Sequence, residues 1–82
     1  MDLSPVERET LLILLSHGDN VPKAISDRAD RHSKSVSRSL SRLEDRGYVV
    51  RKNKYGVWTL TDEGEAVAEQ LQDYGRSEGA GI

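Results

Sequence analysis

A chain of 82 residues can form one small domain with a modest core, so we expect a stability of a few kcal/mol. The absence of cysteine excludes a disulfide framework and a thiolate metal site, and the two histidines have no ligand-like spacing around them. No signal peptide is visible, and the longest apolar run, Leu11 to Leu15, is far too short to span a membrane. We therefore expect a cytoplasmic protein with no membrane partner, no metal and no cofactor.

The net charge of −2 conceals two regions of opposite sign. Residues 31–54 carry a net charge of +6, and the rest of the chain carries −8. Residues 62–73 include five acidic side chains and no basic one. A protein with one basic and one acidic side can engage a polyanion in a fixed orientation.

The first helix is predicted from Pro5 to about residue 17. Ser4 is a natural N-cap, Pro5 suits the first helical position, and Glu7 completes a capping box with Ser4. Gly18 supplies the residue that ends the helix. The five successive apolar residues 11–15 point all round the helix, so we expect it to be covered on more than one side.

A helix-turn-helix pattern is predicted between Pro22 and Gly47. Pro22 opens a short second helix that ends near Ala29, and the segment "DRH" forms a turn. Ser33 is expected to cap the third helix, which runs to about Arg46 before Gly47 closes it.

The segment "SKSVSRSLSRL" (residues 33–43) alternates serine with other residues, which is typical of a strand, but its apolar residues have helical spacing. With Val36, Leu40 and Leu43 on the buried face, the basic side chains face away from the core. They form one i, i+4 row of Lys34, Arg38, Arg42 and Arg46. Like charges at this spacing cost about 0.2–0.5 kcal/mol per pair, so the row favours a polyanionic partner.

The serines of the third helix are small and can donate to phosphate or to base edges. Ser35 and Ser37 are best placed for this, whereas Ser39 is expected to face the domain. The alternative is that the exposed serines are only solvated.

After Gly47 the pattern changes to a β-hairpin and a last helix. The segments "YVVRK" and "VWTL" are strand-like, separated by the turn "NKYG", and Trp58 and Leu60 are expected in the core. Thr61 caps a helix that ends at Tyr74, followed by a flexible tail over residues 75–82. The predicted fold is α+β and mostly helical, with one domain over residues 1–74.

The segment "HSKSVSRSLSRLEDRGYVVR" followed by "WTLTDEG" resembles winged helix-turn-helix transcriptional regulators. The nearest types are MarR-like regulators and the small repressor-like winged-helix proteins of halophilic archaea and their phages. The resemblance covers roughly residues 6–71. It implies that residues 33–46 form the recognition helix and residues 51–56 the wing. The expected DNA-binding residues are Ser33, Lys34, Ser35, Ser37, Arg38, Ser41, Arg42, Arg46, Arg51, Lys52, Lys54 and Tyr55.

The function expected from these features is sequence-specific binding of double-stranded DNA by a transcriptional repressor. We expect a homodimer through the first and last helices, with Leu71 and Tyr74 in the interface. The alternative is a winged-helix module that binds another protein without reading DNA, and RNA binding is a third reading. No catalytic constellation is evident, so we do not expect an enzyme, and no small-molecule effector is assigned.

Overall fold

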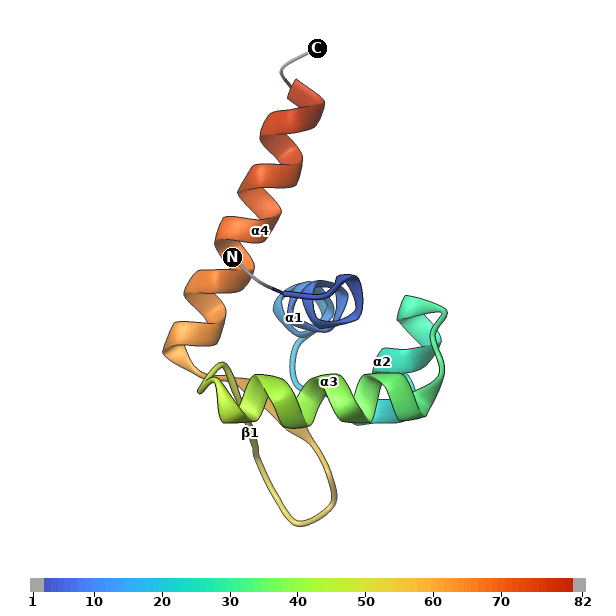
Figure 1. Ribbon diagram of the computed structural model, residues 1–82. Helices are drawn as coiled ribbons and strands as arrows, with labels where there is room; N and C mark the ends of the chain where they lie inside the picture. The colour runs from blue at the N-terminus through green and yellow to red at the C-terminus, as the bar shows by residue number, and fades with distance from the viewer. Residues whose placement is uncertain (1–2, 81–82) are drawn as a thin grey trace.

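In the described part of the chain, four helices and one antiparallel hairpin form the fold (Figure 1). The computed structural model describes residues 3–80, with side chains for residues 3–73. The elements are α1 (Pro5–His17), α2 (Pro22–Ala29), α3 (Ser33–Asp45), β1 (Val49–Arg51), β2 (Trp58–Leu60) and α4 (Asp62–Ala80). Their order and type confirm the predicted α+β winged helix-turn-helix fold.

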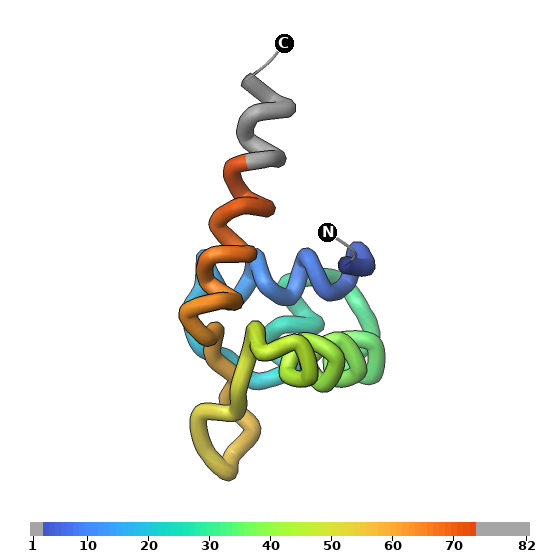
Figure 2. The backbone as a smooth tube through the Cα atoms, turned by 60° about the vertical axis from the view of Figure 1, so that its left-hand side comes forward, coloured from blue at the N-terminus to red at the C-terminus, as the bar shows by residue number. Residues whose placement is uncertain are grey.

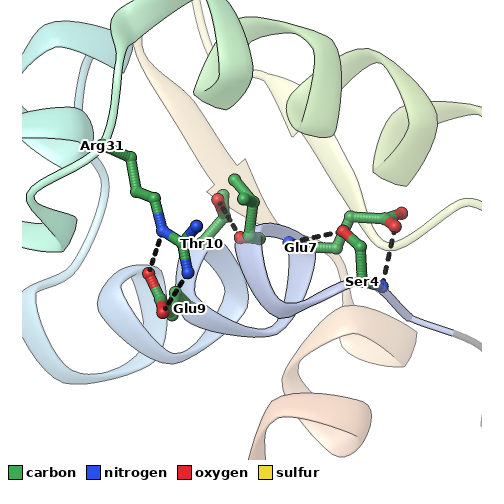
Figure 3. Close-up of polar contacts among 6 residues, drawn as sticks. Ser4, Glu7, Glu9, Thr10 and Arg31 are labelled. Atoms are coloured by element: carbon green, nitrogen blue, oxygen red, sulfur yellow. Dashed lines mark hydrogen bonds and ion pairs between the residues drawn. The ribbon is translucent and has the colours of Figure 1, made fainter.

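The capping residues set the ends of α1 as the sequence predicts. The Ser4 hydroxyl accepts from the Glu7 amide at 3.2 Å, and the Glu7 carboxylate accepts from the Ser4 amide at 3.0 Å (Figure 3). Gly18 ends the helix with a φ of +82°, which favours glycine. Leu11 and Leu14 are buried, and α1 contacts α2, α3 and α4, so it is covered on more than one side.

One hydrophobic core draws residues from all six elements and from the segment before α1. Its buried members are Leu3, Leu11, Leu14, Ile25, Val36, Leu40, Leu43, Val49, Trp58 and Ala68. Three of them lie on one face of α3, as the helical period predicts. Burial of this face fixes which side of α3 points outward.

The turn between α2 and α3 is made by residues 30–32. Asp30 has a φ of +55°, and the Arg31 amide donates to the Ser26 carbonyl at 3.0 Å. The prediction that Ser33 caps α3 is wrong: His32 holds the N-cap position and makes no side-chain capping bond. Ser33 already has helical backbone, so its hydroxyl lies within the first turn instead of before it. α3 ends at Asp45, one residue earlier than expected.

The two paired strands of the wing have three residues each and are shorter than the sequence suggests. The register pairs Val49 with Leu60, residue 50 with residue 59, and Arg51 with Trp58. Asn20, in the loop after α1, adds a single bridge on the other side of Trp58, with N–O distances of 2.8 and 3.1 Å. This third segment joins the wing base to the end of α1.

Thr61 connects the wing to α4. Its hydroxyl accepts from the Gly64 amide at 3.0 Å, which confirms the predicted cap, and donates to the Gly47 carbonyl at 2.6 Å. α4 leads away from the body on the side opposite to the wing (Figures 1 and 2). It continues to Ala80 instead of ending at Tyr74, with no proline in this stretch to stop it. The side chain of Tyr74 lies outside the described residues, and the flexibility of residues 75–82 and the domain boundary at 74 stay predictions.

Candidate nucleic-acid interface

The outward face of α3 carries the basic row. Val36, Ser39, Leu40 and Leu43 are buried, and every other residue of the helix is exposed. The burial of Ser39 confirms that this serine faces the domain, unlike the other serines of α3. All twelve residues predicted to bind DNA, on α3, at its C-cap and on the wing, are exposed; the binding itself stays a prediction.

Three cations of the basic row are available to an external anion. Among the described side chains, no ion pair involves Lys34, Arg38 or Arg42. Their charges are therefore not neutralised within the domain. A helix with such a row on its exposed face presents positive potential to solvent over several turns.

The tip of the wing is held by a side-chain turn. The Asn53 side-chain oxygen accepts from the Tyr55 amide at 2.9 Å and from the Val57 amide at 3.4 Å. The Lys52 amide closes the turn by donating to the Val57 carbonyl at 2.6 Å. The Tyr55 side chain is 76% exposed, and the Lys54 ammonium lies 5.4 Å from its ring centroid. The tip therefore presents an aromatic ring and a cation together.

The two cations nearest the wing base have partners within the domain. The Arg51 guanidinium lies 5.3 Å from the centroid of the Trp58 ring, in cation–π geometry. The Lys52 ammonium donates to the Asp19 carboxylate at 2.8 Å. Hydrogen bonds from Lys52 and then from Thr59 lower the pKa of the Asp19 carboxyl. Sequence reasoning missed Asp19, which lies 33 residues from Lys52 and carries no local signal of this contact.

Arg31 lies in the basic segment of the sequence, but its charge is paired within the domain. Its guanidinium makes two hydrogen bonds to the Glu9 carboxylate, at 3.0 and 3.2 Å (Figure 3). These bonds lower the pKa of the Glu9 carboxyl and raise that of Arg31. The pair ties the helix-turn-helix turn to α1, so Arg31 supports the fold of the motif.

A groove lies between α3 and the wing. It has a volume of about 260 Å³ and is lined from α2, α3, β1, β2 and the wing loop, by Pro22, Ser37, Leu40, Ser41, Arg51, Gly56 and Trp58. Both views of the backbone place α3 and the wing at the same end of the molecule, where α4 begins before it leads away (Figures 1 and 2). One extended ligand could therefore contact the helix and the wing together.

Acidic side chains gather on α4, and two more, Glu44 and Asp45, are exposed at the C-terminal end of α3. Asp62, Glu63, Glu65, Glu69 and Asp73 are exposed on α4. Among the side chains of residues 3–73, no three histidine or acidic groups converge as metal ligands would. None of the helices described within residues 3–80 combines the length and apolarity needed to cross a bilayer.

The family model described as HVO_A0261 N-terminal domain matches residues 3–79. No curated protein matches the chain. Among solved structures, the MarR family protein Rv2887 of Mycobacterium tuberculosis is 24% identical, with a TM-score of 0.81 over 95% of this chain and 58% of that one. A MarR family protein from Bacillus stearothermophilus is 22% identical, with a TM-score of 0.84 over 99% of this chain and 59% of that one.

A third similar structure, a mutant of ZitR from Lactococcus lactis, is 14% identical, with a TM-score of 0.85 over 98% of this chain and 57% of that one. This chain therefore spans a little over half the length of these structures. The likenesses confirm the predicted resemblance to MarR-like winged-helix proteins.

Proposed function

We propose a function from the premise that this chain belongs to the HVO_A0261 N-terminal domain family and has the winged-helix fold described above. The chain is a sequence-specific DNA-binding transcriptional regulator that acts as a repressor. α3 enters the major groove of double-stranded DNA, and the wing contacts the backbone or the minor groove beside it. It is a binding protein and not an enzyme.

The separation of charge over the surface carries this proposal. Lys34, Arg38 and Arg42 on α3, which make no ion pair among the described side chains, lie with the wing at one end of the molecule, whereas the exposed acidic residues of α4 lie along the helix that leads away from it. A duplex approaching the basic end gains attraction, and one approaching α4 is repelled. The charge distribution therefore sets both the ligand and its orientation.

The roles of individual side chains follow from their places on α3. Arg38 and Arg42 lie mid-helix and face outward, so at least one of them contacts base edges, with guanine O6 and N7 as the preferred acceptors. Arg46 and the wing residues Lys52 and Lys54 hold the DNA backbone. For Lys52 this requires that phosphate replace the Asp19 carboxylate as its partner.

The regulator acts as a homodimer. One recognition helix reads only a few base pairs, and two half-sites about 34 Å apart along the duplex double the sequence that is read. α1 and α4 pack together and retain half-buried apolar residues, including Leu12 on α1 and Leu71 on α4, which fit a shared interface. A strict monomer in sedimentation at micromolar concentration, both free and on DNA, would contradict this part of the proposal.

A protein-binding module is the second candidate, and one observation favours it. The large apolar side chains that are exposed among the described residues, Val50 at 43% and Tyr55 at 76%, both lie on the wing. They are two isolated residues beside several cations, which fits contact with DNA better than an apolar protein interface.

Fluorescence anisotropy with labelled oligonucleotides tests the proposal. We expect the protein to bind duplex from its own upstream region more tightly than random duplex, and both more tightly than single strands. Arg38→Ala should cost about 1–3 kcal/mol on the preferred duplex and relax the preference at one base position. Lys54→Ala, the matched control, should weaken all duplexes equally and reduce the salt slope by about one per protomer. Equal, negligible affinity for every oligonucleotide would favour the protein-binding module.

A further inference from the structure

The groove between α3 and the wing combines an apolar wall with three hydrogen-bond donors. Pro22, Leu40 and Trp58 supply carbon surface, and the polar lining comes from two serines of α3 and from Arg51. None of the described residues that line this groove is acidic. An anion that also carries carbon therefore matches the groove better than a cation or a purely apolar group.

Arg51 is preorganised at this groove. Trp58 is only 5% exposed and is fixed in the core, so its ring gives the guanidinium a rigid platform 5.3 Å away. Among the described residues, no carboxylate forms an ion pair with Arg51. A planar guanidinium stacked on an aromatic ring keeps its N–H groups for an oxyanion and loses little side-chain entropy on binding.

Ser37 and Ser41 face the same groove from α3. They are four residues apart, so they lie on one side of the helix about 6 Å apart along its axis. Both are exposed, unlike Ser39 between them. The two hydroxyls and Arg51 therefore approach the groove from opposite walls.

We propose that this groove binds one deoxyribose-phosphate unit of the DNA backbone. Arg51, Ser37 and Ser41 donate to the phosphate oxygens, while the sugar carbons lie against Trp58 and Pro22. The inference rests on the proposed function and decides what that function leaves open: Arg51 holds the backbone at the junction of helix and wing and does not read the minor groove. These contacts fix the register of α3 without selecting a base.

The test pairs variants of the protein with single neutralised phosphates in the DNA. A duplex bound by the wild-type protein is prepared as a series in which one linkage at a time is methylphosphonate, and each is titrated by anisotropy. One linkage in each half-site should weaken wild-type binding by roughly tenfold. Arg51→Ala should lose about the same factor on the unmodified duplex and become insensitive at that linkage. It should also lower affinity for random duplex equally and reduce the salt slope by about one.

Lys54→Ala is the matched control because Lys54 lies on the wing but does not line the groove. It should remain as sensitive as the wild type at that linkage. Arg51→Lys keeps the charge without the planar fork and should lie between the wild type and Arg51→Ala. The Ser37→Ala, Ser41→Ala double variant keeps the charged contact from Arg51 and should lose only part of the sensitivity at the same linkage. Melting curves confirm that the variants are folded.

The outcomes separate this inference from the proposed function. If the wild type binds duplex but Arg51→Ala keeps the full sensitivity, or changes the base preference, the inference fails and DNA binding stands. If the wild type binds no duplex, both fail. A titration of Trp58 fluorescence with inorganic phosphate distinguishes a DNA phosphate from free phosphate as the bound anion. We expect no saturation at micromolar phosphate. Saturation that also displaces DNA would mean that the groove is a site for free phosphate and would overturn the inference.

Discussion

Gly64→Ala should destabilise this protein although alanine is the better helix former. A Cβ atom at Gly64 would lie 1.8 Å from the Tyr48 carbonyl oxygen and 2.7 Å from its carbon. The first turn of α4 must then retreat from the wing base by about 1 Å or more. That movement lengthens two hydrogen bonds that Thr61 donates. Its amide donates to the Tyr48 carbonyl at 3.0 Å, and the Thr61 hydroxyl donates to the Gly47 carbonyl at 2.6 Å.

We expect a loss of about 3 kcal/mol, from overpacking and from weakening these two hydrogen bonds. For a domain of this size the melting temperature should fall by roughly 12–24 °C, measured by circular dichroism. Ala66→Gly is the reciprocal control: Ala66 is exposed on the same helix, and glycine there should cost only about 1 kcal/mol. A Gly64→Ala protein as stable as the wild type, or more stable, would refute the close packing of α4 on Tyr48.

Three further predictions concern α3, the wing and pH. Leu40→Ala should cost about 2–5 kcal/mol in chemical denaturation because Leu40 is fully buried, whereas Arg38→Ala should change stability by less than about 0.5 kcal/mol; equal losses would mean that α3 is wrongly oriented. Asp19→Asn should release Lys52 and raise affinity for any duplex by roughly threefold or more, with a steeper salt dependence; unchanged binding would show that Lys52 makes no phosphate contact. Hydrogen bonds lower the pKa values of the Glu9 and Asp19 carboxyls from the ordinary 4.5 and 3.8. The two carboxylates therefore contribute their full stability to the fold above these ordinary values, and this contribution is lost as the pH falls through their lower folded-state pKa values. The melting temperature should therefore decrease below about pH 4, and Glu9→Gln should flatten that decrease.

Local signals in the sequence were sufficient for most of the fold. The Ser4–Glu7 capping box, the Thr61 cap and the spacing of the apolar residues in α3 depend on residues within a few positions of one another. The same spacing identified which serine is buried and which cations are exposed. Contacts between residues within one helical turn can be predicted from the sequence because the spacing of the residues determines them.

Contacts between distant segments could not be predicted in this way. The Asp19–Lys52 and Glu9–Arg31 pairs join residues 33 and 22 positions apart, and each removes a cation that the sequence counts as available. The groove beside Arg51 likewise exists only once α3, the wing and the start of α2 are packed together. A local sequence gives the sign of a charge, whereas its partner depends on the tertiary arrangement.

Amide chemical-shift mapping by NMR tests most directly which face of the protein binds DNA. A duplex from the chain's own upstream region is titrated into the ¹⁵N-labelled protein, and the shifted amides are placed on the structure. We expect the shifts to concentrate in α3 and in wing residues 51–56, with the acidic residues of α4 unchanged. Shifts confined to α4, or none at duplex concentrations well above that of the protein, would contradict the assignment of the basic end as a DNA-binding surface.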